Sequence, residues 1–177
     1  QKPLRRVLGI EPRLDGMAFD LRVRSAAQSQ QRVSVAYSIR SAKDGELLYT
    51  STEGTSESIA LSGAELHFST PVLHPKLWSP LDPHLYQLEV TLSVDGKIQD
   101  RHITPFGFRT FEVEGEKLLL NGKPFWLRGA NHFPHALRPN DDKLARRFTQ
   151  MAREGNVVMT RTHTPPFTKA WLDATDE

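Results

Sequence analysis

The fold of this protein is decided by residues 85–100, LYQLEVTLSVDGKIQD. Within this stretch every second side chain is apolar, and the positions between them are mostly polar. Such alternation indicates a half-buried β-strand, with one face in the core and the other in water. Asp95-Gly96 follows directly and is typical of a tight hairpin turn, so a second antiparallel strand is expected after it. The alternating residues are Tyr86, Leu88, Val90, Leu92 and Val94.

The same pattern occurs twice upstream, in residues 17–25 (MAFDLRVRS) and 32–40 (RVSVAYSIR). Asp15-Gly16 and Asp44-Gly45 supply further turn signals. Several short strands with tight turns and no helical period predict an immunoglobulin-like β-sandwich over residues 1–109. The residues expected to face its core are Phe19, Leu21, Val23, Val33, Val35, Tyr37 and Ile39.

Composition excludes several classes of partner. Lys and Arg number 23 against 21 Asp and Glu, so the formal net charge is only +2 and we expect no nucleic-acid partner. No apolar run approaches the ~20 residues of a membrane span, and we expect no membrane partner. The absence of cysteine excludes disulfides and thiolate chemistry and leaves the compartment open.

Residues 75–86, PKLWSPLDPHLY, interrupt the strands. The prolines predict a fixed, extended connection instead of a regular strand. Trp78 in this loop has two readings: it stacks on a sugar ring, or it plugs one end of the sandwich. We favour the plug.

The apolar period changes after residue 110. Residues 140–155, NDDKLARRFTQMAREG, predict a helix capped by Asn140, Asp141 or Asp142 and ended by Gly155. Its expected core face consists of Leu144, Phe148 and Met151. Residues 157–161, VVMTR, then indicate a parallel strand covered on both sides.

A second helix is expected to follow, capped by Thr168 and carrying Trp171 and Leu172. The order strand, helix, strand, helix predicts βα units over residues 110–177. Two such units are too few for a (β/α)8 barrel, which takes about 250 residues. We therefore expect the chain to be part of a longer protein.

Three segments in this order resemble glycoside hydrolase family 2, which includes β-galactosidases, β-glucuronidases and β-mannosidases. They are LWSPLDPHLYQLEVTL, FGFRTFEVEGEKLLLNGKPFWLRGAN and NVVMTRTHTPPFTKAWLDATDE. The resemblance implies that the sandwich is followed, from LNGKPFWLRG onward, by the hairpin and first strand of a catalytic (β/α)8 barrel.

The resemblance also implies a retaining glycosidase for terminal β-linked sugars, with two glutamates about 5–5.5 Å apart. In the family both glutamates lie on later barrel strands, and the acid/base belongs to an Asn-Glu pair. This chain has no Asn-Glu dipeptide, and Glu112, Glu114 and Glu116 read as solvated turn residues. We therefore expect no catalytic residue here and no activity from this chain alone.

The resemblance implies that this chain contributes some of the substrate-binding residues of the sugar site. In the family an Arg-Gly-x-Asn segment with a following histidine, and an Arg-x-His segment before a proline, shape the sugar subsite. Barrel sites form where strands end, so these residues are expected just after the two apolar runs. The matching substrate-binding candidates are Arg128, Asn131, His132, His135, Arg161 and His163.

The match has two departures from the family pattern. His132-Phe133-Pro134-His135 replaces the usual Arg-His, so the histidine contact stays open between His132 and His135. Met159 stands where an Asn-x-x-Arg spacing would place arginine, so Arg161 is aligned with the motif instead. For Arg161 and His163 the alternative is a buried ion pair or bonds to loop carbonyls.

No His-x-His or His-x-x-x-His pair occurs, and we expect no metal and no cofactor. The expected partner is a carbohydrate substrate, with a homo-oligomer possible for the full-length enzyme. The alternative function is a non-catalytic β-sandwich module for carbohydrate binding or interaction. The incomplete βα tail argues against that alternative, because it would leave sheet edges open.

Overall fold

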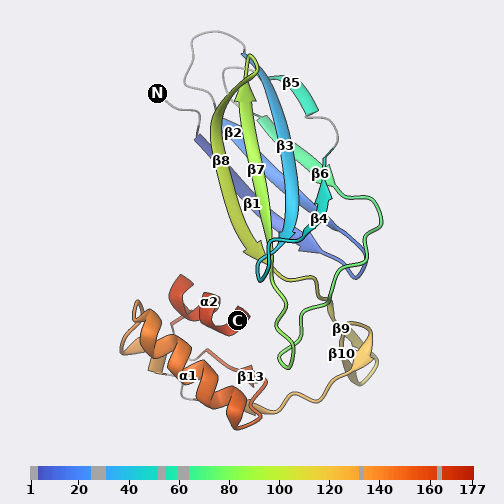
Figure 1. Ribbon diagram of the computed structural model, residues 1–177. Coiled ribbons are helices and arrows are strands. Elements are labelled where there is room, and N and C mark those ends of the chain that lie inside the picture. The colour runs from blue at the N-terminus through green and yellow to red at the C-terminus, as the bar shows by residue number, and fades with distance from the viewer. Residues whose placement is uncertain (1–3, 25–30, 52–54, 60–63, 132–133, 163–164) are drawn as a thin grey trace. The chain divides into compact units, whose positions relative to one another are not determined.

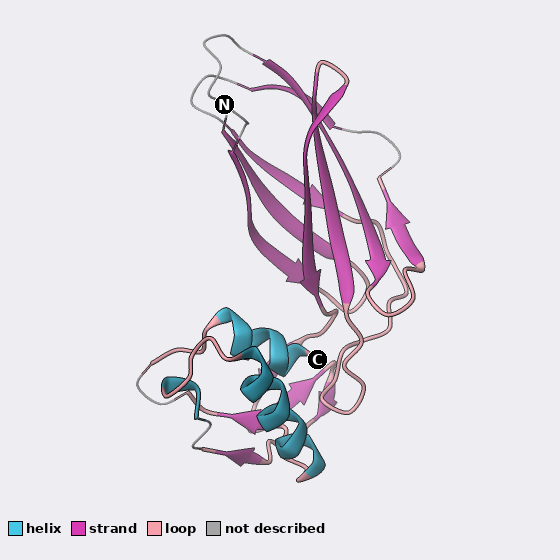
Figure 2. Ribbon diagram, turned by 60° about the vertical axis from the view of Figure 1, so that its left-hand side comes forward, coloured by secondary structure: helices cyan, strands magenta, loops and turns pink. Residues whose placement is uncertain are grey.

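The computed structural model describes residues 4–24, 31–51, 55–59, 64–131, 134–162 and 165–177. The chain divides into two compact units. The first consists of Gln1–Leu77 and His84–Thr110, and the second of Trp78–Pro83 and Phe111–Glu177. Strands dominate the first unit, and both α-helices belong to the second (Figures 1 and 2).

The first unit contains two antiparallel sheets (Figure 1). One has the order β1-β2-β6, formed by Leu4–Pro12, Met17–Arg24 and Ala64–Ser69. The other has the order β4-β3-β7-β8, formed by Leu47–Thr50, Gln31–Ser41, Tyr86–Val94 and Lys97–Phe106. The short strand β5, Thr55–Ile59, also pairs with β3.

The alternating apolar residues fill one core shared by the two sheets. Every core residue predicted for the sandwich is buried, and Leu21, Ile39, Leu88, Val90 and Leu92 are 0% exposed. Phe108, just after β8, is also fully buried. The prediction of a mainly β chain with a β-sandwich is confirmed.

The hairpin predicted from Asp95-Gly96 joins β7 and β8. Asp95 and Gly96 have φ of 50° and 75°, as a type I′ turn requires of both central residues. The turn therefore sets the register of a nine-residue strand against its partner, with Val94 opposite Lys97.

Two buried tyrosines tie the first unit together. The Tyr37 hydroxyl donates to the Ser69 carbonyl at 2.9 Å, which links β3 in one sheet to the end of β6 in the other. The Tyr86 hydroxyl accepts from the Lys76 amide at 2.9 Å and fixes the loop before β7. Burial raises the pKa of both tyrosines, so both keep the phenol proton further into the alkaline range than an exposed tyrosine does.

After the Trp78–Pro83 loop, the second unit continues with the strands β9, β10 and β11, at Phe111–Glu114, Lys117–Leu120 and Lys123–Pro124. β12, Gly129–Ala130, then pairs in parallel with β13, Met159–Thr160. Between them lie the 3-10 turn η1, Pro134–Ala136, and α1, Asp142–Glu154. α2, Lys169–Asp176, follows β13.

Both predicted helices are present, with one difference in the core face. Asp141 caps α1 by accepting from the Leu144 amide at 2.9 Å, and Gly155 ends the helix. Ala145 and Trp171 are fully buried between the helices, whereas Met151 is 57% exposed. The prediction is confirmed for Leu144 and Phe148, which pack against this cluster, and is wrong for Met151, whose place on the contact face is taken by Ala145 and Ala152.

The strand predicted over Val157–Arg161 is parallel but shorter and more open than expected. Regular pairing covers only Met159 and Thr160, and Met159 is 39% exposed. The expectation of cover on both sides is therefore wrong for the chain as it stands. Among the described residues, neither helix is long and apolar enough to cross a membrane.

The plug interpretation of Trp78 is also wrong. Residues 78–83 belong to the second unit, and Trp78 is absent from the sandwich core. Its indole Nε1 donates to the Asp176 carbonyl at the end of α2, at 2.7 Å. Its own carbonyl accepts from the Asn121 amide side chain at 3.0 Å. Trp78 thus ties the β10–β11 turn to the end of α2.

Candidate functional site

The carboxyl edge of the β12–β13 pair is the part of the second unit that matches the predicted sugar site. The parallel register places Ala130 opposite Thr160. Asn131 and Arg161, the next residue on each strand, therefore leave the sheet at the same edge. Both are exposed. The structure thus brings together an amide and a guanidinium that are 30 positions apart in the sequence.

Arg128 lies at the other end of this pair, contrary to the expectation that it follows the strand. It precedes β12, and its carbonyl accepts from the Val158 amide at 2.9 Å. Its Nε donates to the Asn156 carbonyl at 3.1 Å, and its guanidinium lies 5.6 Å from the centre of the Trp126 ring. In this chain Arg128 braces the start of the parallel pair.

His135 is used for packing. Its side chain is buried at 5% exposure, and its Nε2 lies 3.1 Å from the Pro165 carbonyl. Its ring meets Phe167 edge-on at 4.5 Å and lies 6.2 Å from Trp171. Of the two histidines that the sequence left open, His135 is therefore enclosed by the helical core. His132 and His163 lie outside the described residues.

The glutamates singled out in the sequence lie in a different sheet from this edge. Glu112, Glu114 and Glu116 are exposed in the β9–β10 hairpin, as their turn context predicted. Within the described part of the chain no cluster of three or more His, Asp or Glu residues could hold a metal ion. The edge offers hydrogen-bond donors and one positive charge, which suit hydroxyl groups and a carboxylate.

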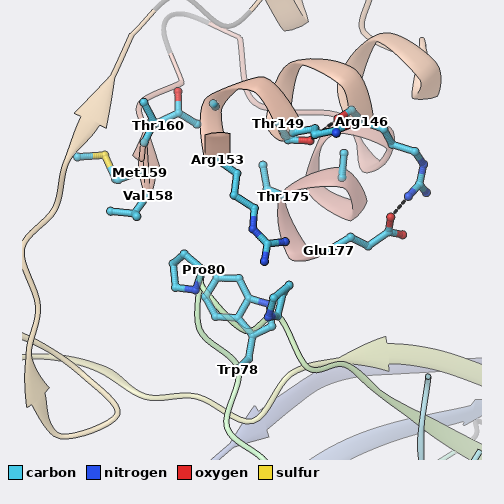
Figure 3. Close-up of a pocket in the computed structure, with 15 residues that line it drawn as sticks. Trp78, Pro80, Arg146, Thr149, Arg153, Val158, Met159, Thr160, Thr175 and Glu177 are labelled. Carbon is cyan, nitrogen blue, oxygen red and sulfur yellow. Dashed lines mark hydrogen bonds and ion pairs between the residues drawn. The ribbon is translucent and has the colours of Figure 1, made fainter. Parts of the chain in front are cut away.

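A separate cavity of about 280 Å³ lies within the second unit (Figure 3). We call it the Trp78 cavity. Its walls are Trp78, Pro80 and Pro83 from the loop, residues 157–160 around β13, one side of α1 and the end of α2. Two rim arginines already have partners: Arg146 pairs with Glu177, and Arg153 donates to the Leu81 carbonyl at 3.1 Å. Of the predicted sugar-site residues that the structure describes, namely Arg128, Asn131, His135 and Arg161, none lines it.

This cavity is not predicted in the sequence analysis. Trp78 and α1 are about 70 positions apart, and no short-range pattern places one against the other. The available signal was the helical spacing of Arg146, Thr149 and Arg153, which marks a second side of α1 next to its core face.

Comparison with known proteins identifies the family. The family model of glycosyl hydrolases family 2 matches residues 7–109, more than half of the chain. A β-galactosidase of Aeromonas hydrophila is 32% identical over 142 residues, which cover 76% of this chain and 14% of that protein. A β-galactosidase of Pectobacterium atrosepticum is 32% identical over 109 residues, covering 59% and 10%. The chain therefore spans only a small part of the length of these relatives.

Solved structures resemble nearly the whole chain. A β-glucuronidase of Bacteroides uniformis superposes with a TM-score of 0.74 at 24% identity, covering 99% of this chain and 21% of that one. A family 2 glycosyl hydrolase from Bacteroides cellulosilyticus gives 0.79 at 20% identity, covering 99% and 24%. At these identities the likeness shows a shared fold. By the family match and the buried sandwich core that underlies it, the chain belongs to glycosyl hydrolases family 2.

Proposed function

We propose that this chain is the sandwich and the start of the (β/α)8 barrel of a retaining β-glycosidase that hydrolyses terminal β-linked sugars. Family membership supports a glycoside hydrolase as the full-length protein. The observation that carries the proposal is the parallel β12–β13 pair joined through α1, with Asn131 and Arg161 at its carboxyl edge. In a (β/α)8 barrel that edge is the site of catalysis.

The proposed roles follow from side-chain chemistry. Arg161 offers a planar fork of donors that holds a carboxylate in a bidentate manner, either on a catalytic glutamate or on the substrate. Asn131 offers both a donor and an acceptor to a sugar hydroxyl. His132 and His163 follow the same two strands in the sequence and are proposed as further sugar contacts, whereas Arg128 is proposed to support the strand start.

The chain alone is proposed to be inactive. A retaining glycosidase needs two carboxyl groups about 5–5.5 Å apart on either side of the scissile bond. The glutamates of the β9–β10 hairpin are solvated, and no Asn-Glu dipeptide is present. Both catalytic glutamates are therefore proposed to lie on other strands of the full-length barrel.

The test is an assay of the full-length enzyme and of residues 1–177 on a panel of nitrophenyl β-glycosides. The full-length enzyme should release nitrophenol from at least one β-glycoside, and proton NMR should show the β-anomer of the sugar as the first product. The shorter chain should release none. Turnover by the shorter chain, or an α-anomer as first product, would refute the proposal. Sugar binding without turnover by the full-length protein would favour the carbohydrate-binding alternative.

A further inference from the structure

We propose that Arg128 and the backbone of Asn156 form a clamp that sets the register of β12 against β13. By holding that register, the clamp positions Asn131 and Arg161 for the reaction. Arg128 is thereby a positioning residue, which acts through the backbone of the parallel pair and not through contact with the sugar. The inference rests on the proposed function, because it takes Asn131 and Arg161 to be sugar-site residues, and it adds the element that holds them level.

The parallel pair is too short to fix its own register. Regular pairing joins only Gly129–Ala130 to Met159–Thr160. Register is weakly specified where a strand is rich in glycine or lacks a long buried face. A slip by one residue would move Arg161 about 3.3 Å along the strand relative to Asn131. A misplacement of about 1 Å can cost an enzyme about 100-fold in rate, so a site at this edge depends on contacts outside the paired residues.

Arg128 holds the segment that leads into β13 at two points. Its carbonyl accepts from the Val158 amide at 2.9 Å, directly before the paired residues. Its side-chain Nε donates to the Asn156 carbonyl at 3.1 Å, two positions earlier on the same segment. Because one bond comes from the backbone of Arg128 and the other from its side chain, a slip of β13 would separate Arg128 from both partners.

The conformation of Asn156 places its carbonyl at the clamp. Asn156 has φ of 57°, in the left-handed region that asparagine adopts more readily than most residues. It follows Gly155, where α1 ends, and its amide donates to the Arg153 carbonyl at 2.9 Å. The chain thus turns from α1 toward β13 at this residue. Its carbonyl lies just beyond the negative end of the α1 dipole, where a cation such as Arg128 is favoured.

Two neighbouring residues favour one geometry of the clamp. The Arg128 guanidinium lies 5.6 Å from the centre of the Trp126 ring, within the range of a cation–π contact, which restricts the rotamers of the arginine. A Cβ built on Gly129 would lie 2.8 Å from Met159 Cε, so the Met159 side chain occupies the space beside the glycine. A register that brought a larger residue to this place would crowd the Met159 side chain.

Amide hydrogen exchange of residues 1–177, followed by NMR, reports the clamp directly. Arg128→Met removes the donor and keeps an aliphatic stem, and Arg147→Met is the matched change on the exposed surface of α1. The Val158 amide is the reporter, because it donates to the Arg128 carbonyl. The Val157 amide is the internal reference, because it donates to the Ala152 carbonyl at 2.9 Å instead.

We expect the Val158 amide to exchange at least about tenfold faster in Arg128→Met than in the wild type, while the Val157 amide changes little. Arg147→Met should change neither rate. Wild-type exchange at Val158 in Arg128→Met would overturn the proposal. Equal acceleration of both amides would also overturn it, since Arg128 would then only stabilise the second unit as a whole.

Two changes at Asn156 test whether its backbone is the second half of the clamp. Asn156→Gly keeps the carbonyl and accepts a positive φ, so the Val158 amide should stay protected. Asn156→Val disfavours the left-handed conformation and should accelerate exchange at Val158. Loss of protection in Asn156→Gly would assign the role to the asparagine side chain and contradict the proposal, as would wild-type exchange in Asn156→Val.

Kinetics of the full-length enzyme test whether the clamp acts through the sugar site. Arg128→Met should lower kcat/KM about 10- to 100-fold, the scale expected for a misplacement of about 1 Å. Arg128→Lys keeps a positive charge and a donor near the end of α1, so it should recover part of this loss. Should Arg128→Met fail to fold, Arg128→Lys carries the same exchange and kinetic comparisons.

A double variant separates positioning from a general loss of stability. If Arg128 acts through the position of Arg161, the combination of Arg128→Met with Arg161→Lys should be no more impaired than the worse single variant. Losses in kcat/KM that multiply would show that Arg128 acts independently of Arg161 and would overturn the positioning role.

Exchange at Val158 does not depend on catalysis. If the full-length protein hydrolyses no glycoside, the proposed function fails, yet exchange still reports whether Arg128 holds the register. If hydrolysis is observed and the Val158 amide keeps its protection in Arg128→Met, only the clamp fails.

Discussion

Asn131 and Arg161 show how a site is assembled from residues that are ordinary in isolation. Each is an exposed polar residue that directly follows a strand of two residues. Their proximity comes from the parallel register, which ends both strands at the same level. A pair placed by backbone hydrogen bonds keeps its geometry without a direct contact between the side chains.

This placement predicts the effect of removing either side chain from the full-length enzyme. Asn131→Ala and Arg161→Lys should each lower kcat/KM about 10- to 150-fold, the loss expected for a charge-assisted hydrogen bond worth ~1.5–3 kcal/mol. Arg147→Ala, on the exposed surface of α1, is the control and should leave kcat/KM unchanged. Wild-type kinetics in both site variants would remove this edge from the sugar site.

The left-handed backbone conformation of Gly96 also affects the stability of the sandwich. Gly96 has φ of 75°, and a Cβ added there would meet no atom within 4 Å. The cost of alanine at this position is therefore only that of the left-handed backbone conformation. Gly96→Ala should lower the free energy of unfolding of the sandwich by about 1–2 kcal/mol. Gly9→Ala, with equally open space and no positive φ, is the matched control and should be near neutral in urea unfolding.

The ionisation of Tyr37 should make the free energy of unfolding depend on pH in the alkaline range. Burial raises its pKa well above the ordinary value, so the folded chain keeps the phenol proton after an unfolded chain has lost it. Its contribution is therefore fully present below the unfolded pKa of about 10 and is lost as pH rises through the folded pKa.

Tyr37→Phe should thus cost about 1 kcal/mol at neutral pH, because the bond to Ser69 is lost. Its free energy of unfolding should then fall less steeply than that of the wild type above about pH 10. Tyr86 shares the raised pKa, so some dependence should remain. Urea titrations across this range check the slope, and identical slopes in the two proteins would contradict the assignment.

At the scale of elements, α1 and α2 depend on contacts outside themselves. α2 has eight residues, and its N-cap Thr168 makes no side-chain capping bond. Isolated helices of this length are marginal in water. The packing of Trp171 against α1 and the bond from Trp78 to Asp176 therefore hold it in place.

Removing the Trp78 donor while keeping an aromatic ring should loosen the second unit selectively. Trp78→Phe should destabilise α2 by about 1 kcal/mol or more, seen as earlier loss of the helical circular dichroism signal in urea. Trp126→Phe, at a position 76% exposed, should have little effect. An unchanged helical transition in Trp78→Phe would show that the bond to Asp176 contributes nothing.

At the scale of the whole molecule, the two units have cores of very different size. Among the residues that the structure describes, eighteen buried residues form the cluster of the first unit and three form the cluster of the second. Because burial of apolar surface is the main favourable term in folding, the second unit should be the less stable one.

Native-state hydrogen exchange on residues 1–177 checks this expectation. Amides of β3 and β7 should exchange only on global unfolding, whereas those of α1 and α2 should exchange through local opening at lower free energy. In the full-length enzyme the helical amides should become protected. Equal protection of helices and strands in residues 1–177 would contradict the difference in stability.

The sequence by itself determined the local structure of this protein. Strict alternation identified β2, β3 and β7 and their buried residues, and Asp95-Gly96 identified a turn. The three candidate caps at positions 140–142 and Gly155 bounded α1, and the structure selects Asp141 among the caps. These features depend on neighbours a few positions apart, so their physical cause can be read along the chain.

Only the tertiary structure decided where Trp78, Arg128, His135 and Met159 belong. Trp78 bonds with a carbonyl 98 positions away, and His135 meets the Pro165 carbonyl 30 positions on. Arg128 lies before its strand because pairing starts at Gly129, and Met159 stays exposed because β13 is covered incompletely. These outcomes depend on which distant surfaces meet, and no local pattern contains that information.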